Sequence, residues 1–192
     1  MPAPPKQRKI AVVGSRSVGS KSSLTVRFVD GHFVESYYPT IENTFSKLIR
    51  VKNGQEFATE IIDTAGQDEY SILNSKHFIG VHGYLIVYSM ASKQSYEMVG
   101  HIKKKILNEL GVDWIPIVVV ANKRDLRPEQ KVLTEKDAEF LEKKLELECP
   151  VIECSARLDE NVNKAFEQLI MVIERGPKKP AEPAGGGKCL TM

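Results

Sequence analysis

The chain has 192 residues, of which 42% are hydrophobic and 27% charged, a composition typical of a globular domain with a full hydrophobic core. Its 27 basic and 25 acidic side chains give a formal net charge of only +2, so charge gives no support for a nucleic-acid partner. The cysteine count of three is odd, and Cys149 and Cys154 flank a predicted buried strand. This pattern argues against a disulfide framework and indicates a reducing compartment.

Predicted strands and helices alternate along the chain. A strand over residues 9–13 leads into a glycine-rich loop and a helix over 22–29. Strands over 44–51 and 55–62 bracket Asn53-Gly54, a dipeptide that favours a type I′ turn and therefore an antiparallel pair. Continuous apolar runs predict strands covered on both faces, with helical patterns between them. These strands span residues 83–89, 115–121 and 151–154, and the helices span residues 93–110, 134–146 and 160–174. A capping box from Thr134 to Asp137 opens the second of these helices.

This alternation predicts an α/β fold with a mostly parallel six-stranded sheet and helices on both faces. In such a sheet the ligand lies beyond the carboxyl ends of the strands. We expect one folded domain over residues 9–175, after a flexible N-terminus of residues 1–8. Residues 176–192 are rich in Pro, Gly and Lys, which predicts a disordered tail.

A near-match to a phosphate-binding loop follows the first predicted strand. It runs Gly14-Ser-Arg-Ser-Val-Gly19 and continues with Ser20, Lys21 and Ser22. In such a loop, backbone N–H groups face the phosphates, the lysine adds charge and the hydroxyl binds Mg²⁺. The standard motif has no residue between its second glycine and its lysine, whereas here Ser20 intervenes. Either the loop bulges while Lys21 and Ser22 keep their places, or the phosphate cradle is disturbed.

Two further motifs also follow predicted strands. Asp63-Thr-Ala-Gly66-Gln67 offers an aspartate that can hold a metal through water and senses a terminal phosphate. Asn122-Lys123-Arg124-Asp125 offers acceptor and donor groups that fit guanine and reject adenine. In this order, the three motifs indicate a guanine-nucleotide site far more specifically than any one of them alone.

With these motifs the chain resembles the Ras superfamily of small GTPases. Residues 39–45, 67–71 and Ser155-Ala156 carry the resemblance further, and it extends over residues 8–175 and the last four. Arg16 stands where Ras has glycine, which makes the chain more similar to the Rheb branch, in a fungal-type form. The resemblance implies a small monomeric GTPase that converts GTP to GDP and phosphate with weak intrinsic activity.

The resemblance also implies how phosphate and metal are held. Lys21 would contact the β- and γ-phosphates, and Ser22 would bind Mg²⁺ directly. Asp63 would hold the metal through water, and Thr40 would complete its shell only when a γ-phosphate is present. Gly66 would donate its N–H to that phosphate.

For hydrolysis, the resemblance implies that Gln67 orients the attacking water, that Thr40 assists, and that Arg16 modulates the rate through its bulk beside Gln67. For base recognition it implies Asn122, Lys123 and Asp125, assisted by the backbone of Ala156. It places Tyr37 over the nucleotide and Phe33 against the base or the ribose. The full nucleotide-binding set so implied is Gly14, Ser17, Val18, Gly19, Ser20, Lys21, Ser22, Ser23, Phe33, Tyr37, Thr40, Gly66, Asn122, Lys123, Asp125, Ser155 and Ala156.

The last four residues, Cys189-Leu-Thr-Met192, fit a prenylation box whose terminal methionine favours a farnesyl group on Cys189. A single lipid chain gives reversible membrane binding, and the few lysines of the tail add little to it. We therefore expect modification by a prenyltransferase. The expected location is the cytoplasmic face of endomembranes or the plasma membrane, with a cytosolic fraction.

The resemblance implies a molecular switch with GTP or GDP as ligand and Mg²⁺ as cofactor. Its implied partners are a GTPase-activating protein and an effector kinase complex of the target-of-rapamycin type, through which it signals growth or nutrient status. An alternative is an interaction module, defective in hydrolysis or independent of nucleotide, because Ser20 spoils turnover. A third reading, an ATP-using enzyme, leaves Asn122 and Asp125 without a role.

Overall fold

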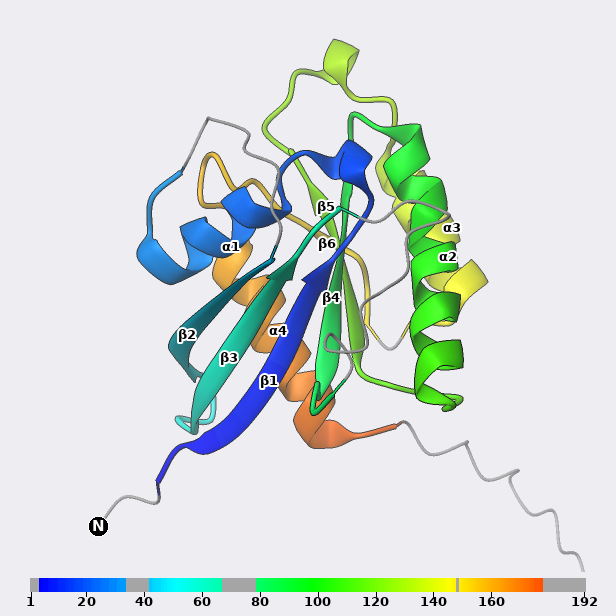
Figure 1. The fold of residues 1–192 in the computed structure, drawn as a ribbon. Coiled ribbons are helices and arrows are strands. Elements are labelled where there is room, and N and C mark those ends of the chain that lie inside the picture. Colours follow the sequence, from blue (N-terminus) through cyan, green and yellow to red (C-terminus); the bar gives the residue numbers. More distant parts are fainter. Residues whose placement is uncertain (1–3, 34–41, 67–78, 148, 178–192) are drawn as a thin grey trace, which may run out of the picture.

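A computed structural model of the chain describes residues 4–33, 42–66, 79–147 and 149–177. Within these residues, six strands form one sheet in the order β2-β3-β1-β4-β5-β6 (Figure 1). The β2–β3 pair is antiparallel and the other neighbouring pairs run parallel, which confirms the predicted fold class. The strands are β1 (Lys6–Val13), β2 (Glu42–Arg50), β3 (Glu56–Thr64), β4 (Gly83–Ser89), β5 (Ile117–Asn122) and β6 (Ile152–Glu153), and the helices are α1 (Lys21–Asp30), α2 (Lys93–Leu110), α3 (Glu135–Leu145) and α4 (Val162–Arg175).

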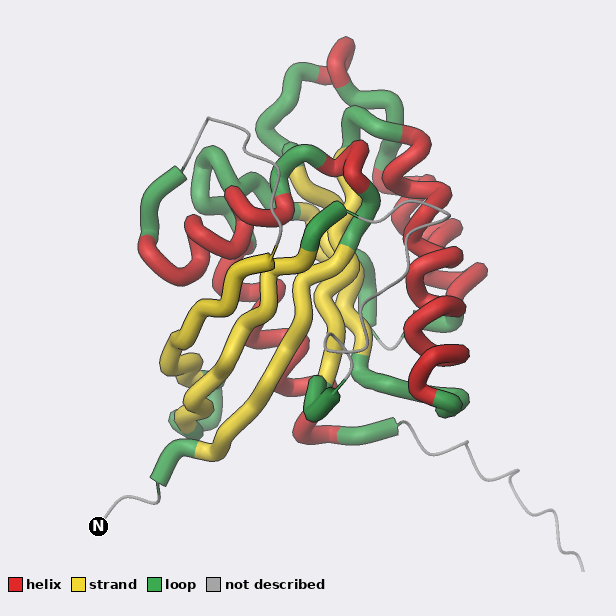
Figure 2. Tube along the Cα trace, in the orientation of Figure 1, coloured by secondary structure: helices red, strands yellow, loops and turns green. Residues whose placement is uncertain are grey.

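Helices cover both faces of the sheet (Figure 2). Side chains of α1 and α4 pack on one face, and those of α2 and α3 pack on the other. In β4 the side chains alternate: Leu85 and Val87 join the α4 side, whereas Tyr84, Ile86 and Tyr88 join the α2 side. Because both faces are covered, all residues of β4 and β5 are buried, and these strands are continuous apolar runs in the sequence.

The β2–β3 hairpin confirms the predicted antiparallel pair but corrects the predicted type I′ turn. A type I′ turn needs positive φ at both central residues, and Gly54 has a φ of 81° while Asn53 has no positive φ. The Gly54 N–H donates to the Val51 carbonyl at 2.8 Å, and the Val51 N–H donates to the Gln55 carbonyl at 3.0 Å. The connection is therefore the three-residue loop Lys52-Asn53-Gly54, in which the glycine takes the left-handed conformation.

The start of β1 also differs from the prediction, because the strand begins at Lys6 rather than at residue 9. Lys6 Nζ donates to the Glu174 carboxylate at 2.9 Å, and Arg8 Nε donates to it at 2.7 Å. Burial alone would raise the pKa of Glu174, but these bonds lower it. At α3 the predicted capping box is confirmed, since the Thr134 N–H donates to the Asp137 carboxylate at 2.7 Å.

Within the described parts of the chain, no disulfide joins Cys149 and Cys154, which are both buried. Burial raises the pKa of the Cys154 thiol to about 12, so this group stays protonated and unreactive at neutral pH. Among the described helices, none has both the length and the apolar character needed to cross a membrane.

Candidate nucleotide-binding site

Loops that follow four strands meet at one edge of the sheet, at the top of Figure 1. They come after β1, β3, β5 and β6, which run parallel to one another in the sheet. Parallel strands place their carboxyl ends at the same edge. The three sequence motifs, together with Ser155-Ala156, therefore come together in space.

The loop after β1 closes on itself in a short 3₁₀ turn over Arg16–Val18. The Ser17 N–H donates to Ser15 Oγ at 3.2 Å, and the Val18 N–H donates to the Ser15 carbonyl at 3.2 Å. The Gly19 N–H donates to the Arg16 carbonyl at 3.3 Å. In a phosphate cradle these three amides face the ligand, whereas here all three donate to acceptors inside the loop.

The extra residue, Ser20, lies between this turn and helix α1. The helix begins at Lys21, so Lys21 and Ser22 hold its first two positions. Lys21 is 7% exposed, and its Nζ donates to the Ser15 carbonyl at 3.2 Å. The Ser20 hydroxyl is close to the Val18 carbonyl, at 3.3 Å. Lys21 and Ser22 therefore keep their places at the helix start, whereas the amides before them are turned into the loop.

Asp63 lies in β3 beside the start of α1 and is fully buried. Among the described residues, no donor makes a hydrogen bond of normal geometry to either of its carboxylate oxygens. Burial raises the pKa of Asp63, while the Ser22 hydroxyl and the Lys21 ammonium group act in the opposite direction. Burial also lowers the pKa of Lys21 to about 8, and the charge of Asp63 opposes that shift.

A buried carboxylate that lacks well-formed hydrogen bonds is costly, and Mg²⁺ prefers oxygen ligands of this kind. The Asp63 carboxylate and the Ser22 hydroxyl therefore fit the implied cofactor. When bound, Mg²⁺ would neutralise negative charge on the phosphates. Lys21 adds a second positive charge on the same side of the site.

Arg16 covers Gly66, the glycine after Asp63-Thr-Ala. A Cβ at residue 66 would lie 2.6 Å from both Cα and Cγ of Arg16, so this approach requires glycine. Arg16 Nε also lies 3.4 Å from the Gly66 carbonyl. Arg16 therefore crowds Gly66, whereas the expected crowding of Gln67 stays a prediction because Gln67 lies outside the described residues.

Asn122 joins the loop after β1 to the loop after β6. Its Nδ2 donates to the Ser20 hydroxyl at 2.9 Å, and its Oδ1 accepts the Ala156 N–H at 3.2 Å. Asn122 is 1% exposed, so these bonds are shielded from water. The side chain thus holds two loops together, and the extra residue Ser20 supplies one of its partners.

Asp125 is oriented by the neighbouring Ser155 hydroxyl, which donates to Asp125 Oδ1 at 2.7 Å. Ser155 Oγ in turn accepts the Leu158 N–H at 3.0 Å. Lys123 has a φ of 70°, and its Nζ would lie 3.7 Å from a Cβ built on Gly19. Lys123 therefore extends over the phosphate loop, while Asp125 is partly exposed with a fixed carboxylate that can accept two donors from guanine.

Other implied residues lie at the same edge or outside the described chain. Gly14 and Val18 are buried residues of the phosphate loop, Ser23 lies in the first turn of α1, and Phe33 is partly buried after that helix. The roles of Tyr37, Thr40, Gln67 and Cys189 stay predictions, because these residues lie outside the described ranges.

Two further residues contact these loops without belonging to any motif. The Ser17 hydroxyl donates to Gln94 Oε1 of α2 at 2.7 Å. Arg27 of α1 donates to the carbonyls of Ala156 and Arg157. No short sequence pattern marks either residue, because both contacts depend on how the helices pack beside the loops.

The chain matches the family model described as Ras family over residues 9–175. It is 65% identical over 192 residues to the small monomeric GTPase RhbA of Aspergillus fumigatus, covering 100% of both chains. It is 60% identical over 188 residues to the GTP-binding protein rhb1 of Schizosaccharomyces pombe, covering 98% of each. It is 45% identical over 187 residues to the GTP-binding protein Rheb of Homo sapiens, covering 97% of this chain and 98% of that protein. The matched residues include all three motifs.

Proposed function

Because the chain belongs to the Ras family and is a small GTPase of the Rheb type, we propose that it is a membrane-tethered switch controlled by GTP. The observation that supports this most strongly is that the residues suited to phosphate and metal and the residue suited to guanine lie at the same edge of the sheet. Lys21 and the buried carboxylate of Asp63 suit a phosphate with its metal ion. Asp125, fixed by Ser155, suits guanine.

In this proposal, the γ-phosphate supplies partners that GDP lacks. Thr40 and the Gly66 N–H gain ligands only with GTP bound, and hydrolysis removes them. Arg16 lies over Gly66, where a water-orienting group and an incoming arginine would approach. Hydrolysis is therefore slow without a GTPase-activating protein.

The membrane tether is a farnesyl group on Cys189. Support from the fold is the position of α4, which ends at the opposite end of the sheet from the nucleotide site (Figure 1). A tether that follows α4 leaves the nucleotide site on the side away from the membrane. A single chain makes the attachment reversible, with a cytosolic fraction.

The output we propose is control of a kinase complex of the target-of-rapamycin type in response to growth or nutrient status. This part rests on the resemblance of the sequence to the Rheb branch. The second candidate, an interaction module independent of nucleotide, is favoured by the closed phosphate loop.

Both candidates are tested by adding purified protein, loaded with GDP or with a non-hydrolysable GTP analogue, to the isolated kinase complex. The switch gives binding and kinase stimulation with the GTP analogue alone. Equal binding in both nucleotide states, and without nucleotide, would replace it with the interaction module. In cells, Cys189→Ser should move the protein wholly into the cytosolic fraction, and retention of this variant on membranes would contradict a farnesyl anchor.

A further inference from the structure

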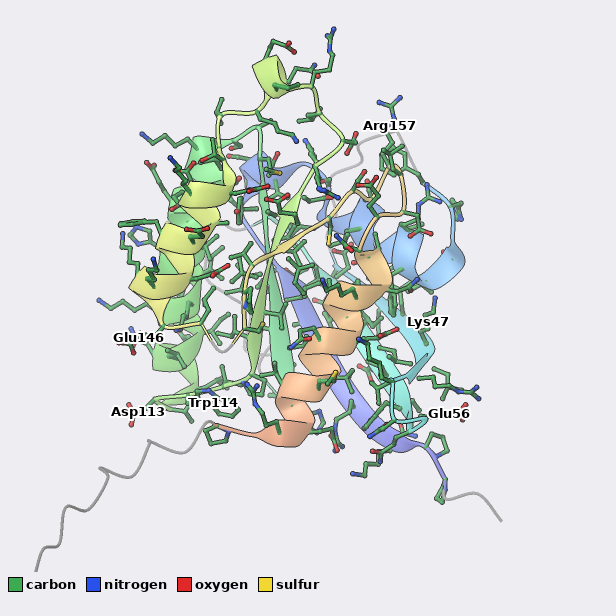
Figure 3. The ribbon with its side chains drawn as sticks, turned by 180° about the vertical axis from the view of Figure 1, so that it is seen from behind. Lys47, Glu56, Asp113, Trp114, Glu146 and Arg157 are labelled. Atoms are coloured by element: carbon green, nitrogen blue, oxygen red, sulfur yellow. The ribbon has the colours of Figure 1, made fainter. Side chains whose placement is uncertain are left out.

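Arg27, in the last turn of α1, uses one guanidinium group to bind three backbone carbonyls. Its Nε donates to Ala156 at 2.8 Å and one terminal nitrogen donates to Arg157 at 3.0 Å. The other terminal nitrogen donates to Gly31, the residue after α1, at 2.7 Å. The side chain therefore bridges the end of its own helix and the loop after β6, and Figure 3 shows Arg157 on that loop above α1.

This geometry needs arginine. A guanidinium presents five N–H donors in a rigid plane, and a lysine ammonium cannot reach three carbonyls arranged in this way. The Arg27 side chain is partly buried, so water competes less for these carbonyls than at an open surface. Charged donors also make stronger hydrogen bonds than neutral ones.

The peptide groups on either side of the Ala156 Cα are both engaged. The Ala156 N–H donates to Asn122, and the Ala156 carbonyl accepts from Arg27. Since Asn122 also binds Ser20, hydrogen bonds run without a break from the phosphate loop, through Ala156, to α1. The loop that the resemblance assigns to the guanine base is thus held from two sides.

Arg27 also reaches Phe33, the last described residue before position 34. Its guanidinium carbon lies 5.9 Å from the centroid of the Phe33 ring, within the range of a cation–π contact. The resemblance places Phe33 against the base or the ribose. One arginine therefore contacts two elements expected on the base side of the nucleotide.

We propose that Arg27 is a positioning residue for guanine: it fixes the Ala156 loop and Phe33, and so sets base selectivity and the lifetime of the bound nucleotide. The inference rests on the proposed guanine-nucleotide site. It adds a residue that contacts none of the reacting groups and acts through the base-binding loop.

The test compares Arg27→Ala and Arg27→Lys with the wild-type protein, using fluorescent GDP for release rates and ADP as a competitor. Losing charged hydrogen bonds should speed GDP release by about tenfold in Arg27→Ala. Affinity for ADP should stay unchanged, so the preference for GDP over ADP falls by the same factor. Arg27→Lys keeps the positive charge but not the three hydrogen bonds, and should recover only a minor part of the lost preference for GDP.

Arg50→Ala is the matched control, because Arg50 is an exposed arginine paired with Glu56 at 2.5 Å, far from the site. Figure 3 shows Glu56 near the end of the sheet opposite Arg157. An equal loss of GDP and ADP affinity in Arg27→Ala, with a lowered melting temperature, would show a merely structural role. Unchanged GDP release in both Arg27 variants would overturn the proposal outright. Failure of the wild-type protein to bind GDP would instead overturn the proposed nucleotide site.

Discussion

The base-binding region and the phosphate loop differ in which groups their hydrogen bonds join. In the base region, side chains fix other loops: Ser155 orients Asp125 at 2.7 Å, and Arg27 holds the Ala156 carbonyl at 2.8 Å. In the phosphate loop, the amides of Val18 and Gly19 donate to carbonyls of the loop itself. The base region therefore holds its geometry in advance, whereas the phosphate loop must exchange hydrogen bonds when phosphates bind.

This difference shows where the cost of binding lies. A backbone hydrogen bond contributes a net free energy of about 1 kcal/mol, so opening two of them costs about 2 kcal/mol, or roughly thirtyfold in affinity. The phosphates offset this cost by accepting the freed amides. The base contributes its interactions without such an exchange, so changes in the base region should have larger effects than changes in the loop.

The largest effect is expected from Asp125→Asn. The carboxylate accepts two donors from guanine, and losing both charged hydrogen bonds should weaken GDP binding by roughly a hundredfold. Xanthine offers the complementary pattern to an amide, so xanthosine diphosphate should bind better to the variant than to the wild type. A competition titration with both nucleotides measures this, and an unchanged preference would remove guanine recognition from Asp125.

A smaller effect is expected from deleting Ser20. Without this residue the closed turn loses its link to Asn122, and GDP should associate about tenfold faster because fewer loop bonds must break. Ser20→Thr is the control, since it keeps both the loop length and the hydroxyl, and its association rate should match wild type. If the deletion variant binds no faster by stopped-flow fluorescence, the closed turn is not a barrier to binding.

The smallest effect concerns pH. Burial lowers the pKa of Lys21 to about 8, and bound phosphate favours the protonated ammonium. Nucleotide binding should therefore take up a proton as pH rises through this value, and affinity should fall by about fourfold between roughly pH 7 and 8.5. Calorimetry in buffers of different ionisation enthalpy reports the proton uptake. The Lys21→Arg variant stays charged, so its nucleotide affinity, though lower, should no longer depend on pH in this range. If the affinity of this variant still falls with pH, the pH dependence belongs to another group.

The sequence allowed the central fold to be predicted, because buried parallel strands such as β4 and β5 leave uninterrupted apolar runs. The guanine and metal motifs were recognisable because each begins at the carboxyl end of a strand. The predicted type I′ turn was wrong because Asn53-Gly54 fits both a two-residue loop and a three-residue loop, and the pairing register of the two strands decides between them.

Other features depended on contacts between distant parts of the chain. Ser20 left two outcomes open for the phosphate loop, and its bond to Asn122 belongs to the tertiary structure. The same holds for Arg27, whose helical position in the sequence resembles that of any solvent-exposed arginine. Its three carbonyl partners become neighbours only when the loop after β6 packs beside α1.

The most direct test of a guanine-nucleotide switch is to identify the nucleotide that the protein carries. Wild-type protein purified without added nucleotide is denatured, and the released molecules are separated by ion-exchange chromatography. GDP and GTP, in an amount close to one per chain, are the expected result, because the base region is assembled and the site suits phosphate with Mg²⁺. Adenine nucleotides would contradict guanine recognition, and a nucleotide-free protein that also fails to bind added GDP would show that the closed phosphate loop prevents binding.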